Sequence, residues 1–315
     1  MLDSFMVAFG AVIPFLIYLG IGWGVVRLGW TDKPFLERLN NLVFKVLFPF
    51  MMFQNVYSIT PDGFPSWKLL VYGPVSVILL VAAAMVIIPR LVKENPRRGA
   101  IIQALFRSNY LLYGVPMTVY VFGEEKSGIA GVILAVMVTV FNVTAVIVLE
   151  YYNGSRKVRV GELLLKMVKN PLLQGCALGI LFFLTGLHLP VFLAKPVAAL
   201  GNSATPLALI TLGGTMEFAA FRKNAKAVSA VLALKLVVLP LIFTLIAYAI
   251  GLRGVELFLA LMIFATPVAV SSYPMAVNMG ADGELAGQLV FASTIASLAT
   301  IFAFIFTFSQ MGLLA

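Results

Sequence analysis

Charged residues are scarce in this chain. Only 11% of its 315 residues are Asp, Glu, Lys or Arg, whereas 61% are hydrophobic, and the mean hydropathy is +1.03. A soluble domain is about half apolar and about a quarter charged, so this chain has too little polar material to cover a surface in water. The composition therefore excludes a soluble enzyme and indicates an all-α protein that crosses the bilayer many times.

Cysteine and histidine each occur once. Cys176 has no second cysteine for an intrachain disulfide, and its apolar neighbours indicate an inert, small hydrophobic side chain. A metal site of His and Cys ligands cannot be assembled from Cys176 and His188, so we expect no metal and no cofactor. An intramembrane enzyme would need a nucleophile positioned beside a base or a metal, and no Asp lies inside an apolar segment. We therefore expect no catalytic residue.

Acidic residues are also few, 13 against 22 Lys and Arg, and the formal net charge is +9. The basic residues lie in short clusters between apolar segments. This pattern is typical of signals that orient membrane helices, and it differs from a surface that follows nucleic-acid phosphates. We therefore expect the lipid bilayer as a partner and no nucleic acid.

Ten apolar segments have roughly the length that crosses a bilayer. They cover residues 5–26, 39–57, 67–89, 100–122, 128–150, 171–187, 196–218, 227–250, 255–279 and 285–310. The first segment lacks a basic leader and an early small-residue cleavage site, so it is expected to be a retained span.

Alternate loops differ strongly in positive charge. One set holds Arg27, Lys33, Arg38, Arg90, Lys93, Arg97, Arg98, Arg156, Lys157, Arg159, Lys166, Lys169, Arg222, Lys223 and Lys226, and the other holds only Lys68, Lys126, Lys195 and Arg253. Cytoplasmic loops carry the excess of Lys and Arg, so the first set is expected to be cytoplasmic. The bias therefore predicts a protein of the cell membrane (inner or plasma membrane) with both termini on the outer side.

The two halves of the chain show weak internal similarity. At an offset of 158 residues, Phe106 matches Phe264, Pro116 matches Pro274 and Met117 matches Met275. The matched spans are five apart, so the second copy would enter the membrane from the opposite side. We expect an inverted repeat of five plus five helices, with residues 1–150 and 171–315 joined by a short basic cytoplasmic loop at 151–170.

Prolines interrupt the fourth and ninth spans. Proline removes a backbone hydrogen bond from a helix and disfavours helical geometry in the residue before it. We expect helix breaks at Gly114 and Pro116 and between Pro267 and Pro274, although simple kinks would also fit. At such breaks, the freed amides and positive ends of the second half-helices would attract an anion, with proline at their first position.

Polar side chains gather near both expected breaks. The candidate substrate-binding residues are Arg107, Ser108, Asn109, Tyr113, Thr266, Ser271, Ser272 and Tyr273. Asn109 is the first choice, because its amide can donate to a carboxylate and also accept. Hydroxyl groups could equally bond helix to helix. Arg107 either marks a pathway or a paired structural site, or extends to the inner interface.

Further charges lie within the predicted spans. Lys45 could guide anions or extend to the membrane surface, and Glu217 could pair with nearby Arg222 and Lys223 or carry a coupling proton. Lys235 and Glu150 are the others. No carboxylate lies near either expected break, which makes a dedicated sodium site less attractive, and coupling to protons, to sodium or to neither stays open.

Four segments together resemble the auxin efflux carrier family, which includes bacterial transporters described as malonate or malate permeases. They are residues 40–53, 107–117, 169–181 and 266–280, and the most specific feature is Asn109 seven residues before Pro116. The resemblance implies ten spans with crossing helices 4 and 9, a homodimer, and an organic-anion site at the crossing. It also implies a scaffold of helices 1, 2, 6 and 7, with the other six moving in an elevator-like step.

The leading hypothesis is thus a carrier of small organic anions, secondary active or facilitative, with carboxylates such as malonate, malate or auxin-like acids as substrates. The alternative is a sodium-coupled symporter of the bile-acid type, which shares the ten-span plan with crossing helices. A channel is disfavoured because only the crossing is polar.

Overall fold

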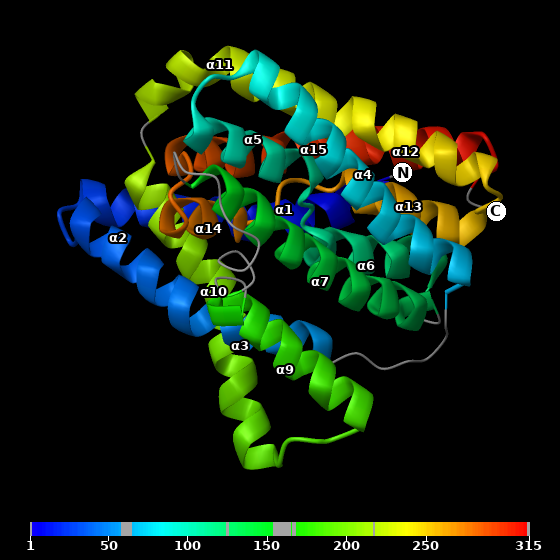
Figure 1. Ribbon diagram of the computed structural model, residues 1–315, viewed down its shortest axis with the longest axis horizontal. Coiled ribbons are helices and arrows are strands. Elements are labelled where there is room, and N and C mark those ends of the chain that lie inside the picture. Colours follow the sequence, from blue (N-terminus) through cyan, green and yellow to red (C-terminus); the bar gives the residue numbers. More distant parts are fainter. Residues whose placement is uncertain are drawn as a thin grey trace.

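The structure is a computed structural model that describes residues 2–57, 65–123, 126–153, 165, 168–216 and 218–313. Within this part of the chain the regular elements are helices, and the only bridge between extended segments joins Ser108 to Val268. The α-helices are α1 (Leu2–Arg27), α2 (Lys33–Leu42), α3 (Phe48–Tyr57), α4 (Trp67–Leu91), α5 (Asn95–Phe106), α6 (Tyr110–Phe122), α7 (Ser127–Tyr152), α9 (Pro171–Thr185), α10 (Val191–Thr215), α11 (Phe218–Ala233), α12 (Leu239–Ala249), α13 (Gly254–Ala265), α14 (Ser272–Asn278) and α15 (Gly283–Gln310) (Figure 1). The prediction of an all-helical protein is confirmed.

Several helices are apolar and long enough to span a membrane. Five qualify by length and composition: Trp67–Leu91, Gly128–Tyr152, Val191–Thr215, Arg222–Ala249 and Gly283–Gln310. Shorter apolar helices lie at Leu16–Arg27, Tyr110–Phe122, Pro171–Thr185 and Gly254–Ala265. These helices fit a polytopic membrane protein.

Four helices begin five or more residues before the predicted spans. Helix α10 begins at Val191 and not at 196, and the other three begin at Lys33, Asn95 and Phe218, whereas their apolar segments begin at 39, 100 and 227. In these last three the first turns carry polar and basic residues, so hydropathy detects the helix only after it has begun. Local signals mark the true start of α2: the Asp32 carboxylate accepts from the Phe35 N–H at 2.8 Å, and a proline lies in the first turn.

Two short π-helical stretches widen otherwise continuous helices. They are η1 (Val43–Leu47), between α2 and α3, and η3 (Leu234–Val238), between α11 and α12. Each is followed two residues later by a proline, Pro49 or Pro240. A proline ring clashes with the carbonyl of the fourth residue before it, and a wider turn relieves that clash.

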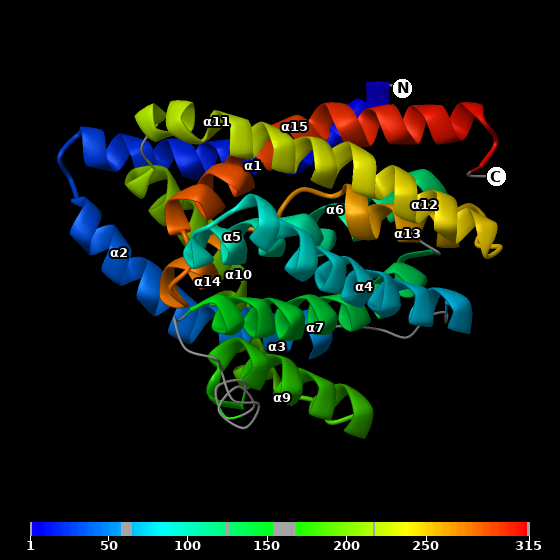
Figure 2. The same ribbon diagram turned by 45° about the horizontal axis from the view of Figure 1, so that its top comes forward.

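The helices form two groups. In one, α1 lies along α10, and α3 lies along both α9 and α10. The other comprises α4 to α7 and α11 to α15. Within it α13 lies against α4, α6, α7, α12 and α15, and every residue from Leu257 to Ala265 is fully buried. Figures 1 and 2 show α9 and the first half of α10 projecting from this second group.

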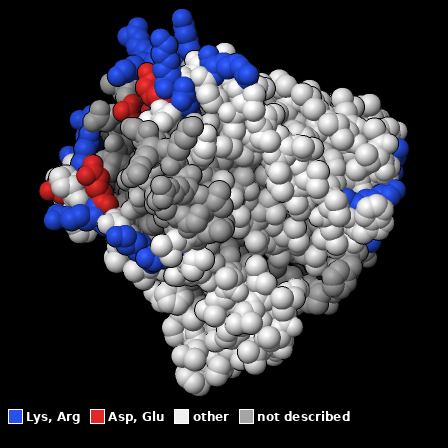
Figure 3. All heavy atoms as spheres, in the orientation of Figure 1, with Lys and Arg blue, Asp and Glu red and all other residues white. Residues whose placement is uncertain are grey.

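On the face seen in Figure 3, the exposed charges gather at the ends of the molecule. Figure 3 shows Lys and Arg gathered near the ends of α2 and α11, a smaller group at the opposite edge, and a wide uncharged surface between them. Lys33 and Lys223 are exposed at the first end, and Lys68 and Arg253 at the other. An uncharged belt between two charged ends is the surface that a bilayer requires.

Candidate functional site

Two helices are interrupted within the second group. The first break comprises residues 107–109, between the end of α5 and the start of α6, and the second comprises residues 266–271, between α13 and α14. The expected break between Pro267 and Pro274 is confirmed in position, with Pro267 inside it and Pro274 in the first turn of α14.

The prediction for the first break was wrong by about two helical turns. Gly114 and Pro116 lie inside α6, and neither Pro116 nor Pro274 occupies the first position of its helix. Helix α6 continues through Pro116, and the Thr118 hydroxyl donates to the Gly114 carbonyl at 2.7 Å. The ring of Tyr110 packs so closely on Gly114 that a Cβ there would lie 2.9 Å from it.

The two breaks cross and pair through their backbones. The Asn109 N–H donates to the Pro267 carbonyl at 2.8 Å, and the Ala269 N–H donates to the Arg107 carbonyl at 3.3 Å. The Val268 N–H donates to the Ser293 hydroxyl of α15 at 3.0 Å. These bonds satisfy backbone groups that would otherwise be unpaired in a water-free region, so each break stabilises the other.

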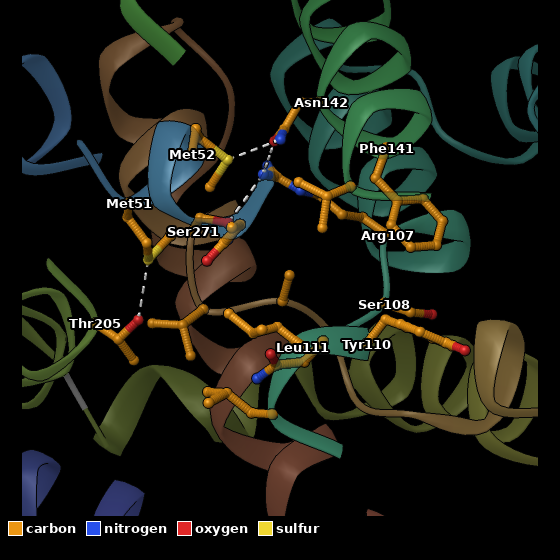
Figure 4. A pocket seen from close by; sticks show the side chains of 16 residues that line it. Met51, Met52, Arg107, Ser108, Tyr110, Leu111, Phe141, Asn142, Thr205 and Ser271 are labelled. Atoms are coloured by element: carbon orange, nitrogen blue, oxygen red, sulfur yellow. Dashed lines mark hydrogen bonds between the residues drawn. The ribbon is translucent and has the colours of Figure 1, made fainter. Parts of the chain in front are cut away.

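Arg107 links the crossing to α7. One terminal nitrogen of its guanidinium donates to Asn142 Oδ1 at 2.6 Å and to Ser271 Oγ at 2.9 Å, and the other donates to the Met275 sulfur. The side chain is 2% exposed, so it does not extend to the membrane surface. Its partners are neutral, and Figure 4 shows Arg107, Asn142 and Ser271 converging at one side of a cavity.

This cavity has a volume of about 50 Å³ and lies between the two helix groups. Met51, Met52 and Asn55 of α3 and Thr205 of α10 line one side. The other side is formed by both breaks, the first turn of α6 and one face of α7. A molecule bound there would contact both groups of helices at once.

Asn109 is placed to bind a ligand. It is the residue that precedes α6, yet its side chain makes no capping hydrogen bond, and it lines the cavity. The residue is 7% exposed, and its Nδ2 has no hydrogen-bond partner among the described residues. A buried donor without a partner carries a desolvation penalty, which a bound acceptor would remove.

Four of the predicted binding residues line the cavity, and four do not. Arg107, Ser108, Asn109 and Ser271 line it, whereas Tyr113, Thr266, Ser272 and Tyr273 are buried elsewhere. Tyr273 faces a second cavity of about 360 Å³ between α2, α10, α14 and α15, where its hydroxyl bonds to Thr215 Oγ1 of α10 at 2.7 Å.

The remaining predicted charges are spread over the molecule. Lys45 lies in η1, is exposed and faces a separate apolar groove between α3 and α9. Glu217 lies outside the described residues, and Glu150 lies near the end of α7. Lys235, in η3, is fully buried and donates to Ser108 Oγ. The buried residues of the described chain include two cations, Arg107 and Lys235, and no Asp or Glu.

Sequence reasoning missed three polar residues of the cavity, Asn142, Asn55 and Thr205. Asn142 is 1% exposed and sits in the middle of the apolar helix α7, where its amide donates to the sulfurs of Met52 and Cys176. An amide side chain inside an otherwise apolar span could have revealed it. Asn55 lies near the end of α3 beside Gln54, so it does not stand out as a single polar residue among apolar ones.

Interrupted helices that cross beside a cavity, in a chain of apolar helices, define a membrane transporter. The chain belongs to the family described as "Membrane transport protein", which matches residues 7–305. This is the auxin efflux carrier-like family, so the predicted resemblance is confirmed. The chain is also 25% identical over 300 residues to an uncharacterized transporter of Methanothermobacter thermautotrophicus, covering 94% of this chain and 97% of that protein. The family is one of transporters and not of enzymes.

Proposed function

We propose that this transporter is a secondary active or facilitative carrier of small organic anions, with carboxylates such as malonate, malate or auxin-like acids as its substrates. The observation that carries the proposal is the unpartnered amide of Asn109, buried at the start of α6 and lining the cavity beside Arg107. The amide donor, the positive end of α6 and the guanidinium all favour a negatively charged group.

The charge balance of the site supports an anionic substrate. Arg107 has only neutral hydrogen-bond acceptors around it, and a buried charge without a counter-charge is costly. A carboxylate in the cavity would compensate this charge and accept from Asn109 Nδ2. The same arrangement would repel a cationic substrate.

The position of the cavity supports an elevator-type mechanism of alternating access. We propose that α1, α2, α3, α9 and α10 form a scaffold, and that α4 to α7 and α11 to α15 form the moving transport domain. The cavity lies where these two groups meet, so a displacement of one group along the other would carry the substrate between the two sides of the membrane.

Helix contacts support the proposed inverted repeat. If each helix of the first half corresponds to the one five spans later, the contact of α1 with α10 corresponds to that of α9 with α3. Likewise, the contact of α4 with α5 corresponds to that of α12 with α13. We propose that the chain resides in the cell membrane as a homodimer with both termini outside.

The test is the variant Asn109→Ala in proteoliposomes. Hydrogen bonds to charged groups are worth about 1.5–3 kcal/mol, so we expect carboxylate affinity to fall roughly tenfold or more, with the folded protein intact. Asn202→Ala, at an exposed position of α10, is the matched control and should behave as the wild type. Unchanged malonate and malate transport by the Asn109 variant would remove this residue from the site.

The crossing is also compatible with a sodium-coupled symporter of the bile-acid type. The ends of α5 and α13 point carbonyl groups toward the breaks, and such groups can hold Na⁺. Uptake measured with Na⁺ replaced by choline at equal ionic strength separates the two functions. Loss of uptake in choline would favour the symporter.

A further inference from the structure

Lys235 is buried in a stretch of which three of the five residues are exposed, and Leu236 is the other buried one. The side chain is 0% exposed, whereas Leu234, Val237 and Val238 in the same π-helical stretch are 39%, 42% and 39% exposed. Lysine inside a membrane span normally reaches toward the membrane surface. Here the wide turn of η3, followed by Pro240, directs it into the protein.

The ammonium group of Lys235 reaches the crossing without lining the cavity. It donates to Ser108 Oγ at 2.5 Å, and Ser108 pairs with Val268 in the other break. Ser108 also lines the cavity, whereas Lys235 does not. Ser108 therefore links Lys235 to the cavity.

The C-terminal ends of two helices lie beside η3. Helices α12 and α13 form an antiparallel hairpin, so η3, which precedes α12, lies against the end of α13, and it also contacts α5. Both α5 and α13 end at the breaks, where their last carbonyl groups carry partial negative charge. In transporters with interrupted helices, such C-terminal ends and unwound carbonyls hold the coupling Na⁺.

Resting on the proposed function, we infer that Lys235 is a tethered cation that takes the place of a coupling ion. Its ammonium group stabilises the negative ends of α5 and α13 and fixes Ser108, and through it the crossing that presents Asn109. Because a Na⁺ bound there would be repelled by the ammonium, anion transport proceeds without Na⁺. Lys235 is accordingly a positioning residue and does not contact the substrate.

The first experiment uses the purified, full-length wild type. We expect malonate uptake in proteoliposomes and the unfolding temperature in detergent to be the same in NaCl and in choline chloride at equal ionic strength. Uptake or stability that requires Na⁺ would overturn the inference. If no carboxylate is transported in either salt, the proposed function fails, and the unfolding measurements below still decide the role of Lys235.

The second experiment uses Lys235→Ala, which leaves a space for a free cation. We expect a lower unfolding temperature that ethylammonium, which replaces the lost group, partly restores, whereas the bulkier tetramethylammonium does not. Lys226→Ala, at an exposed position of α11, should show no such response. A destabilised Lys235 variant that ethylammonium fails to rescue would contradict a role for the charge.

Two further variants keep the test decisive if Lys235→Ala does not fold. Lys235→Met retains most of the volume without the charge, and Lys235→Arg retains the charge. We expect Lys235→Met to bind carboxylate about tenfold more weakly, which is near the upper end of the effect of removing one charge at a helix end. Lys235→Arg should retain more of the affinity. Equal affinities in wild type and Lys235→Met would overturn the inference.

Discussion

Arg107 has a structural and an electrostatic role in the same side chain. Its backbone carbonyl pairs with the second break, while its guanidinium bonds to α7 through Asn142 and to Ser271. It therefore fixes the relative positions of three segments that are far apart in sequence. Because the residue that joins these segments is an arginine, it also places a positive charge beside the cavity.

We predict that Arg107→Lys destabilises the protein although the charge is kept. An ammonium group cannot reproduce the planar fork that reaches Asn142, Ser271 and Met275 together. Loss of one or two charge-assisted hydrogen bonds should lower the free energy of unfolding by about 1.5–3 kcal/mol, measured by thermal unfolding in detergent. Arg90→Lys, at an exposed position, is the control. Equal stability of the two variants would show that the fork is not needed.

The individual residues of the site were only partly predictable from the sequence. Arg107, Ser108, Asn109 and Ser271 stand out because polar residues inside apolar spans are unusual, and all four line the cavity. Tyr273 has the same signal but faces the cavity beside α10, since only the packing of α14 decides which way each side chain points.

The helices carry a different lesson, because the first break lies away from its proline. Pro116 predicts a break in α6, yet the helix continues through it and the break lies at residues 107–109 instead. Those residues pair with residues 267–269, which lie 160 positions away and satisfy the backbone groups that the break exposes. Such pairing between distant segments overrides the local preference, and a sequence pattern cannot reveal it.

We predict that Tyr273→Phe weakens the contact between the two helix groups. The hydroxyl of Tyr273 on α14 bonds to Thr215 on α10, so an elevator-type displacement would have to break this bond. Neutral hydrogen bonds contribute about 0.5–1.5 kcal/mol, and removing this one should raise the initial transport rate by up to roughly tenfold if its rupture limits the rate. Tyr248→Phe, at an exposed site, serves as control.

A slower or unchanged rate in the Tyr273 variant, with normal folding, would contradict this gating role. The same measurement in a Thr215→Val variant gives an independent check. Both substitutions remove one partner of a single bond, so their effects on the rate should be similar and should not add in the double variant.

Close approach of α1 and α10 depends on glycine. A Cβ at Gly22 would lie 2.0 Å from the Ile210 carbonyl oxygen, whereas a Cβ at Gly20 would meet nothing within 4 Å. We predict that Gly22→Ala forces these helices apart and costs about 1–3 kcal/mol, while Gly20→Ala in the same helix costs little. Thermal unfolding of the two variants measures this difference, and equal shifts would argue against tight α1–α10 packing.

Over the whole chain, the sequence predicted most of the helices, because apolar length is a strong signal. Each predicted span overlaps one or more helices in the described residues, whereas the arrangement of those helices could be expected only from weak similarity between the halves. The contacts of α1 with α10 and of α9 with α3 follow the same pairing rule. Small residues serve both pairs, since a Cβ at Gly175 of α9 would lie 2.3 Å from the Pro49 carbonyl oxygen.

The proposed orientation of the chain makes a prediction for labelling from water. Cys176 is 2% exposed, so the native chain should not react with a membrane-impermeant maleimide. Labelling of an introduced cysteine can therefore be measured without a contribution from Cys176. Lys223→Cys lies at the strongly basic end and should react only after the membrane is permeabilised. Lys68→Cys, at the opposite end, should react in intact cells, because the basic end is expected to face the cytoplasm. The reverse result would place the termini inside, and reaction of both variants from the same side would refute an odd number of crossings between residues 68 and 223.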